Sequence, residues 1–136
     1  MKNNKLIIYT DGGARGNPGP AGIGAVLYNE AQEKIAEISQ YLGIATNNQA
    51  EYQALIEALK KAKDLGAKEV DVFMDSELVV KQLNREYKVK NKDLAPLFLQ
   101  VYNLSLSFSK ISFSHIYREE NVIADRLANE AMDRGI

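Results

Sequence analysis

The chain has 136 residues, of which 46% are hydrophobic and 26% are charged, so it has enough apolar material for one domain with a hydrophobic core, residues 1–136. It contains no cysteine, which excludes disulfides, thiolate metal sites and a cysteine nucleophile. The formal net charge of −1 argues against a protein that holds nucleic acid through an overall positive charge, so any such binding must be local.

The sequence shows no sign of a membrane segment or a secretion signal. No apolar run approaches the ~20 residues that a membrane-spanning helix needs. The N-terminal MKNNK leads directly into a strand, without the apolar segment of a signal peptide. We therefore expect a cytoplasmic protein, monomeric and without a membrane partner.

The stretch 6–22 begins as a strand and changes character at a carboxylate. Residues 6–9 (LIIY) are aliphatic or aromatic, which predicts a strand buried on both faces. The strand is expected to stop at Asp11, and a turn-rich loop follows that contains five of the nine glycines, at positions 12, 13, 16, 19 and 22. Such a loop exposes backbone amides that a polyanion can approach closely. A tight hairpin turn that Asp11 merely caps is the open alternative.

Two further strands follow this loop. Residues 21–29 and 34–42 have the composition of strands and are separated by the polar residues EAQE. Strands joined by such short turns pair in opposite directions, so the first three strands are predicted to form an antiparallel meander.

The next segment changes to the period of a helix. Thr46 and Gln49 fit a capping box that opens a helix running to about Leu65, before Gly66. Glu51 lies at the edge of the apolar stripe of this helix. A carboxylate there is costly unless it is compensated, so we expect a positive charge nearby. A glutamate that only complements the helix N-terminus is the simpler alternative.

The strand after this helix leads to another acid. Residues 69–74 (EVDVFM) alternate in polarity, and a crossover helix precedes them, which predicts a strand parallel to the first. Asp75 follows at the carboxyl end of that strand and just before a predicted helix, where open α/β sheets bind their ligands. Ser76 is interpreted as the cap of that helix and not as a nucleophile, because no pairing with a base can be inferred.

The C-terminal third contains a helix, a strand and a final helix. Residues 93–107 have helical spacing with Pro96 in the first turn, and residues 110–117 (KISFSHIY) alternate as a strand. Asn121 can cap the final helix, whose opening turns contain Asp125. The predicted element order is therefore βββαβα(α)βα. The predicted buried stripe of the final helix consists of Ile123, Leu127, Ala128, Ala131 and Met132.

Four acids share one property, which is that each lies at a strand end or a helix start and not on a solvated face. They are Asp11, Glu51, Asp75 and Asp125. Hard divalent cations such as Mg²⁺ take carboxylate oxygens as ligands. If the four acids converge, their mutual repulsion requires cations, and two ions ~3.5 to 4 Å apart could hold both reacting oxygens of a phosphoryl transfer. Spacing alone is a weak signal, because the chain has 18 acidic residues.

The motifs around these acids resemble a known family. The strings YTDGGARGNPGPAGIG, TNNQAEY, MDSELVVKQL and REENVIADRLANEA are similar, in this order, to the successive motifs of the type 1 ribonuclease H family. The resemblance extends from about Ile7 to Ala131. It implies an α/β protein with the ribonuclease H-like fold, a five-stranded mixed sheet of three antiparallel and then two parallel strands with helices on both faces.

The resemblance also implies a function. It implies an endonuclease that hydrolyses the RNA strand of RNA/DNA hybrids with two Mg²⁺ or Mn²⁺ ions, leaving 5′-phosphate and 3′-hydroxyl ends, and that recognises RNA by its 2′-hydroxyls. A catalytically silent nucleic-acid-binding module and a metal-dependent phosphatase for small molecules are the alternatives. The implied catalytic, metal-binding residues are Asp11, Glu51, Asp75 and Asp125. The residues implied to touch the nucleic-acid backbone are Gly12, Gly13, Asn17, Thr46, Asn47 and Asn48.

Two features depart from the family pattern. Many members carry a basic, tryptophan-containing protrusion, of which only the basic segment Lys81–Lys92 remains here, so we expect modest substrate affinity; a solvated face is the alternative for this segment. The family also has a mobile loop histidine, but His115 falls within a predicted strand and is interpreted as a packed, structural residue. Arg118 is then the cation nearest to the shortened loop, and we expect it to assist departure of the product phosphate.

Overall fold

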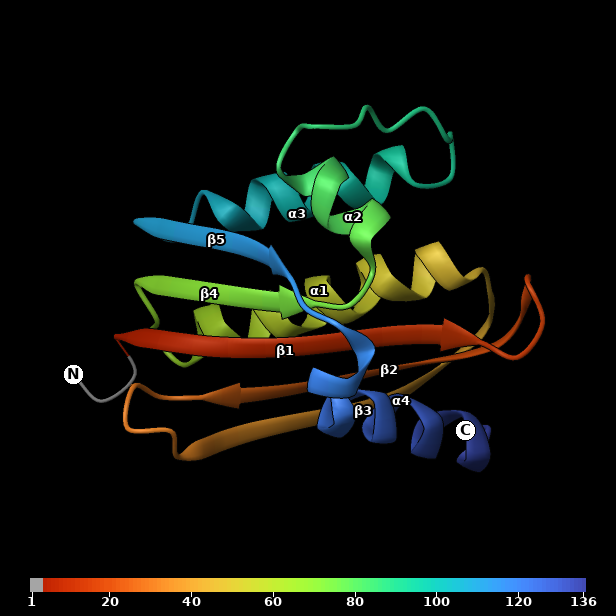
Figure 1. Cartoon of the computed structure of the whole chain (residues 1–136), viewed down its shortest axis with the longest axis horizontal. Coiled ribbons are helices and arrows are strands. Elements are labelled where there is room, and N and C mark those ends of the chain that lie inside the picture. Colours follow the sequence, from red (N-terminus) through yellow and green to blue (C-terminus); the bar gives the residue numbers. More distant parts are fainter. Residues whose placement is uncertain (1–3) are drawn as a thin grey trace.

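A five-stranded sheet forms the centre of the molecule in the computed structural model, which describes residues 4–136 (Figure 1). Its strand order is β3-β2-β1-β4-β5; β1, β2 and β3 pair antiparallel, and β4 and β5 run parallel to β1. The predicted mixed sheet is therefore confirmed. The strands are β1 (Lys5–Ala14), β2 (Gly19–Tyr28), β3 (Lys34–Ala45), β4 (Glu69–Met74) and β5 (Lys110–His115).

Helices cover both faces of the sheet. α1 packs against β1 and β2 on one face and against α3, while α4 packs against β2 and β3 on the other (Figure 1). Within residues 4–136, no helix is both long enough and apolar enough to cross a membrane. The helices are α1 (Asn47–Asp64), α2 (Glu77–Leu83), α3 (Ala95–Ser105), the short 3₁₀ helix η1 (Arg118–Glu120) and α4 (Val122–Arg134). This order agrees with the predicted βββαβα(α)βα.

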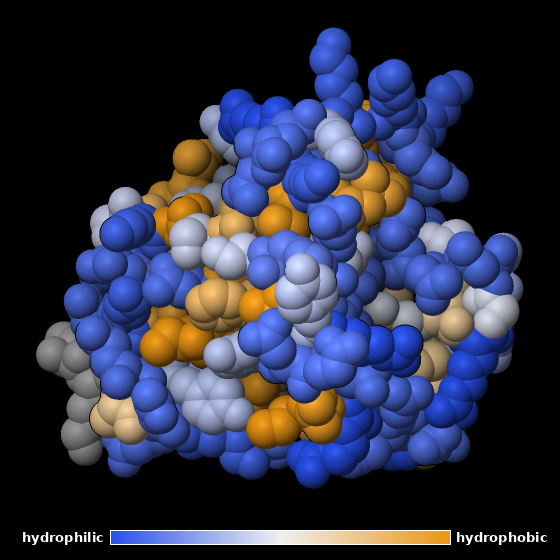
Figure 2. Space-filling view, viewed as in Figure 1, coloured by the Kyte–Doolittle hydropathy of each residue, from blue (hydrophilic) through white to orange (hydrophobic). Residues whose placement is uncertain are grey.

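Strand β1 is buried on one face and not on both. Leu6 and Ile8 are fully buried in the core beneath α1, whereas Ile7 and Tyr9 on the opposite face are only half-buried. The reason is that α4 packs chiefly against β2, and Ile7 and Tyr9 of β1 line a cavity beside the N-terminal end of α4. Figure 2 shows apolar side chains at the surface of this side of the molecule. The prediction of burial on both faces is therefore wrong.

Strand β1 also continues past Asp11, where it was expected to stop. It runs to Ala14 and pairs with β2 throughout, with Asp11 opposite Gly24 and Gly13 opposite Gly22. Of the glycines that suggested a loop, only Gly16 has a positive φ, 99°, in the connection between the two strands. The others lie within strands, so the expected loop is short.

The predicted helix caps are present at α1 and α2. The backbone N–H of Gln49 donates to Thr46 Oγ1 at 3.1 Å, and the Thr46 N–H donates to Gln49 Oε1 at 2.8 Å, which completes the capping box. Gly66, with a φ of 83°, follows the end of α1. Ser76 Oγ accepts from the Val79 N–H at 3.3 Å, so Ser76 is a cap, as predicted.

Helix α4 lies unusually close to the sheet, and this determines which of its residues are buried. A Cβ atom added to Gly24 of β2 would overlap the Ala124 carbonyl oxygen, so glycine permits this contact. Ala124 is fully buried, whereas Ile123, which was predicted to be buried, is 39% exposed. The helix is therefore rotated so that small side chains meet the sheet. The buried residues of α4 are Ala124, Leu127, Ala128 and Ala131.

Candidate active site

Four acids from different parts of the chain line one cavity of about 430 Å³. They are Asp11 in β1, Glu51 in α1, Asp75 directly after β4 and Asp125 in α4. Carboxylate oxygens of the first three all lie within 4.8 Å of one another. Asp125 is close enough for its charge to act on both Asp11 and Asp75. The structure thus brings the four predicted acids together.

Close contact between β1 and α1 brings Glu51 to Asp11. A side chain on Gly12 would overlap the carbonyl group of Ala50, so the first turns of α1 can approach β1 only because residue 12 is glycine. At this contact the Gly12 N–H donates to Glu51 Oε1 at 3.1 Å. The carboxylate of Glu51 is thereby held at the cavity.

Asn121 holds Asp75 in place. Its side-chain nitrogen Nδ2 donates to Asp75 Oδ2 at 3.3 Å and to the Thr10 carbonyl oxygen at 2.8 Å. Asn121 occupies the N-cap position just before α4, as predicted, but its side chain makes no capping hydrogen bond to the helix. The predicted capping role is therefore wrong, because the side chain turns inward and joins β1 to the loop after β4. No motif or spacing in the sequence indicated this link.

Burial and like charge make the acid cluster unfavourable when all its members are ionised. Burial raises the pKa of Asp11 to about 8, and the neighbouring Asp75 and Asp125 add to the effect. Burial also raises the pKa of Glu51 well above its ordinary value, with repulsion from Asp11 contributing. The pKa of Asp75 is raised by burial as well, although the hydrogen bond from Asn121 opposes this.

No side chain within residues 4–136 supplies the positive charge that was expected to pair with Glu51. Within residues 4–136, neither Glu51, Asp11 nor Asp75 forms an ion pair; the cluster's single ion pair joins Arg118 Nη2 to Asp125 Oδ1 at 3.7 Å. The donor set consists entirely of carboxylate oxygens, which suit hard cations such as Mg²⁺ and Mn²⁺. The residues present therefore fit a divalent cation.

The predicted nucleic-acid contacts lie beside this cavity, and three of the six line it: Gly12, Gly13 and Asn47. Asn47 Oδ1 accepts from the Ala14 N–H at 2.8 Å, and the Asn47 N–H donates to Asn17 Oδ1 at 3.0 Å. These hydrogen bonds join the β1–β2 hairpin to the start of α1. Thr46, Asn48 and Asn17 do not line the cavity.

Arg118 and His115 both lie near the acids and both are exposed. Arg118 in η1 lines the cavity, and its side chain is 79% exposed. His115 is the last residue of β5, an edge strand, and its ring contacts the exposed Tyr117 at a centroid distance of 5.6 Å. The interpretation of His115 as a packed residue is therefore wrong, because His115 stands at the exposed end of an edge strand. The positive charges of Arg118 and His115 both act to lower the pKa of Asp75.

The basic segment Lys81–Lys92 forms the end of α2 and the exposed connection towards α3. The Lys81 ammonium lies 5.0 Å from the centre of the Tyr87 ring, and the Arg85 guanidinium lies 5.5 Å from the centre of the Tyr102 ring. Two of its cations are thus held on aromatic rings, and the lysines beyond Tyr87 are exposed.

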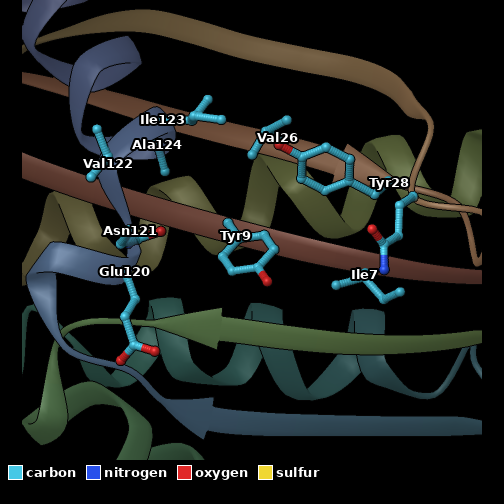
Figure 3. A pocket seen from close by; sticks show the side chains of 10 residues that line it. Ile7, Tyr9, Val26, Tyr28, Glu120, Asn121, Val122, Ile123 and Ala124 are labelled. Carbon is cyan, nitrogen blue, oxygen red and sulfur yellow. The ribbon is translucent and has the colours of Figure 1, made fainter.

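A second cavity of about 530 Å³ lies between the sheet and the N-terminal end of α4 (Figure 3). Figure 3 shows Tyr9 and Tyr28 from the strands opposite Val122 and Ile123. None of the four acids lines it, so the candidate chemistry belongs to the smaller cavity. Sequence reasoning did not assign five further residues to that smaller cavity, although it had placed Ala128 and Met132 in the buried stripe of the final helix. The five are Ala14, Arg15, Ala128, Asn129 and Met132.

Comparison with known proteins agrees with this site. The family model described as "Reverse transcriptase-like" matches residues 9–131. The chain is 49% identical to the "Bifunctional protein Rv2228c" of Mycobacterium tuberculosis over 95% of its length, but it spans only 36% of that protein. It is 36% identical to the "Ribonuclease H" of Ruthia magnifica, with 96% of this chain and 97% of that protein covered.

A solved structure gives the same result for the fold. The structure of LC11-RNase H1, isolated from compost, in complex with an RNA/DNA hybrid is 48% identical to this chain. It superposes with a TM-score of 0.90 over 95% of this chain and 97% of that chain. The sheet and helices described above are therefore arranged as in that protein.

Proposed function

Because this chain belongs to the ribonuclease H family, we propose that it is a metal-dependent endonuclease that hydrolyses the RNA strand of RNA/DNA hybrids. The observation that carries the proposal is the convergence of carboxylate oxygens from Asp11, Glu51 and Asp75 within 4.8 Å, with Asp125 beside them in the same cavity. Relatives named ribonuclease H and a similar protein solved with an RNA/DNA hybrid support the substrate class.

In this proposal the four acids hold two Mg²⁺ or Mn²⁺ ions. When bound, such ions supply Lewis-acid catalysis of phosphoryl transfer. Asp11 has the central place, since its charge acts on Glu51 and the charges of Asp75 and Asp125 act on it. The hydrogen bonds from Gly12 to Glu51 and from Asn121 to Asp75 keep these carboxylates oriented before substrate arrives.

Other residues would bind substrate and release product. The space beside Gly12 is filled by α1, whereas Gly13 lines the cavity without a side chain and would leave room there for a sugar–phosphate chain, next to Asn47. RNA would be distinguished from DNA by its 2′-hydroxyls. Arg118 places an exposed positive charge next to Asp125, where it would assist departure of the 5′-phosphate while the other product keeps a 3′-hydroxyl.

The test is cleavage of a labelled RNA/DNA hybrid with Mg²⁺ or Mn²⁺, beside duplex DNA, duplex RNA and a simple phosphate ester. We expect cleavage of the hybrid's RNA strand and, on mapping the ends, 5′-phosphates. Binding of the hybrid without cleavage would indicate a catalytically silent binding module. Turnover of the phosphate ester alone would indicate a phosphatase that acts on small molecules. Either result, from a protein with an intact fold, would refute the proposal.

A further inference from the structure

The cavity with the four acids also contains a cation that none of these acids engages. Among the described residues that line the cavity, only Arg15 and Arg118 are basic. Arg118 lies beside Asp125, whereas Arg15 Nη2 lies 2.6 Å from Asp133 Oδ1, which is outside the cluster. Arg15 is therefore a positive charge at the cavity that remains available to a ligand.

The hairpin between β1 and β2 fixes the backbone of Arg15. The Arg15 N–H donates to the Pro20 carbonyl oxygen at 2.8 Å, and the preceding Ala14 N–H donates to Asn47 Oδ1 at the same distance. A side chain on Gly19 would overlap the Arg15 carbonyl, so the turn closes tightly around this residue. These contacts fix the backbone of Arg15, whereas its side chain is 48% exposed.

The partners of Arg15 continue the line of the active site along α4. Asp125, Asn129 and Asp133 follow at intervals of four residues and so share one face of the helix. Arg15 Nη2 also donates to the Asn129 carbonyl oxygen at 3.5 Å. Asp125 and Asp133 are separated by about 12 Å along the helix axis, so Arg15 lies farther along α4 than the acid cluster. Figure 1 shows the hairpin and the C-terminal part of α4 at the same end of the molecule.

We propose that Arg15 binds a backbone phosphate of the strand being cut, a few nucleotides from the phosphate at the acid cluster, an inference that rests on the proposed function. Asp133 holds the guanidinium in the free protein, but the two side chains are 48% and 66% exposed, and exposed ion pairs contribute little. A phosphate offers arginine paired, charge-assisted hydrogen bonds. The phosphate therefore displaces Asp133, which acts as a competitor that lowers affinity for the hybrid.

Binding of a fluorescent RNA/DNA hybrid in Mg²⁺, measured by anisotropy at several salt concentrations, tests this contact. All proteins carry Asp11→Asn to prevent cleavage. We expect Arg15→Gln to weaken binding about tenfold at low salt and to reduce the dependence of log K on log salt by about one unit. Arg126→Gln is the matched control, because Arg126 is an exposed arginine on α4 that pairs with acids, Glu130 at 3.6 Å and Glu37 at 3.9 Å, but does not line the cavity. It should change affinity less than twofold.

The competitor role has its own test. Asp133→Asn should tighten binding about threefold when Arg15 is present and have no effect in the Arg15→Gln protein, while Glu130→Gln should change nothing. Equal effects of Arg15→Gln and Arg126→Gln would overturn the proposal, as would an Asp133→Asn effect that persists without Arg15. Cleavage of the hybrid by the unmutated protein separates this failure from failure of the proposed function, which would leave no cleavage at all.

Discussion

Among single side chains, Asp11 is the one that most affects the others in the cluster. Its burial and its charged neighbours raise its pKa to about 8. We expect Asp11→Asn to reduce hybrid cleavage by at least ~100-fold, since it removes a ligand charge at the centre of the site. The variant should stay folded and, without metal, melt at a higher temperature, because one source of repulsion is gone.

Single-turnover cleavage and calorimetry in EDTA measure these two effects. Asp64→Asn, which removes an exposed acid at the opposite end of α1 from Glu51, serves as the control and should alter neither. Near-normal cleavage by Asp11→Asn would remove Asp11 from the centre of the proposed mechanism.

Arg118 and His115 are distinguished by a pair of alanine substitutions. Arg118 lines the cavity with an exposed side chain, so Arg118→Ala should leave the fold intact and lower turnover by ~10-fold to 100-fold, the effect of losing one charge-assisted contact. His115 is exposed at the end of β5, so His115→Ala should change the free energy of unfolding by less than about 0.5 kcal/mol and spare turnover. Steady-state kinetics and urea unfolding check both. The reverse pattern of turnover would assign product release to His115.

In the packing of elements, the contact between β1 and α1 depends on one missing side chain. Gly12→Ala would place a Cβ against the Ala50 carbonyl and 2.6 Å from the Glu51 nitrogen, so α1 must move. We expect a loss of about 1–3 kcal/mol in unfolding free energy, and lower turnover per folded molecule because Glu51 is displaced. Urea unfolding and active-site-normalised rates measure these effects.

The neighbouring residue supplies the matched control. A Cβ on Gly13 would find its nearest atoms 3.9 Å away, which is ordinary van der Waals contact. Gly13→Ala should therefore fold with nearly unchanged stability. If both substitutions behaved alike, the close approach at Gly12 would not be what positions Glu51.

The order and type of the elements were predictable because hydrophobic periods and capping residues are local signals. The alternation in residues 69–74 and the Thr46–Gln49 box each specified their element correctly. The extent of β1 was not predictable, because the glycines at 12, 13, 16, 19 and 22 indicate a loop by local preference. All of these except Gly16 lie in strands instead, and Gly12 of β1 and Gly24 of β2 leave room for α1 and α4 to approach. Only the packed structure reveals that role.

For the molecule as a whole, the acid cluster makes stability depend on pH and metal. The pKa of Asp11 is raised in the folded state, so the folded protein binds protons more tightly than the unfolded chain between about pH 4 and 8. Without metal, stability should therefore fall as the pH rises through this range. Because a cation binds the ionised acids, Mg²⁺ should raise the melting temperature more at pH 8 than at pH 5.

Melting curves in EDTA and in Mg²⁺ at the two pH values provide the measurement. Asp11→Asn should show a smaller loss of stability with pH than the unmutated protein. An unmutated protein whose metal-free melting temperature rises from pH 5 to pH 8 would contradict this account of the cluster.

The sequence located each acid of the candidate site, but the links between them required the three-dimensional structure. Asp75 and Asp125 were found because each stands next to an element boundary that local patterns define. The bond from Asn121 to Asp75 and the ion pair of Arg15 with Asp133 join residues far apart in the chain, and no local pattern encodes them. The exposure of His115 likewise depends on the position of β5 at the edge of the sheet.

The position of α4 at the end of this fold gives the site an order of assembly during protein synthesis. A chain growing on the ribosome has Asp11, Glu51 and Asp75 once its first 75 residues are made, but it lacks Asp125 and the brace from Asn121 to Asp75 until α4 emerges. Domains are made from the N-terminus at ~5 to 20 residues per second, so this interval lasts seconds. During that time the nascent chain carries an incomplete acid cluster next to the messenger RNA and the ribosomal RNA. Under the proposed function, nuclease activity would therefore require α4 to be in place, in addition to the three acids made earlier.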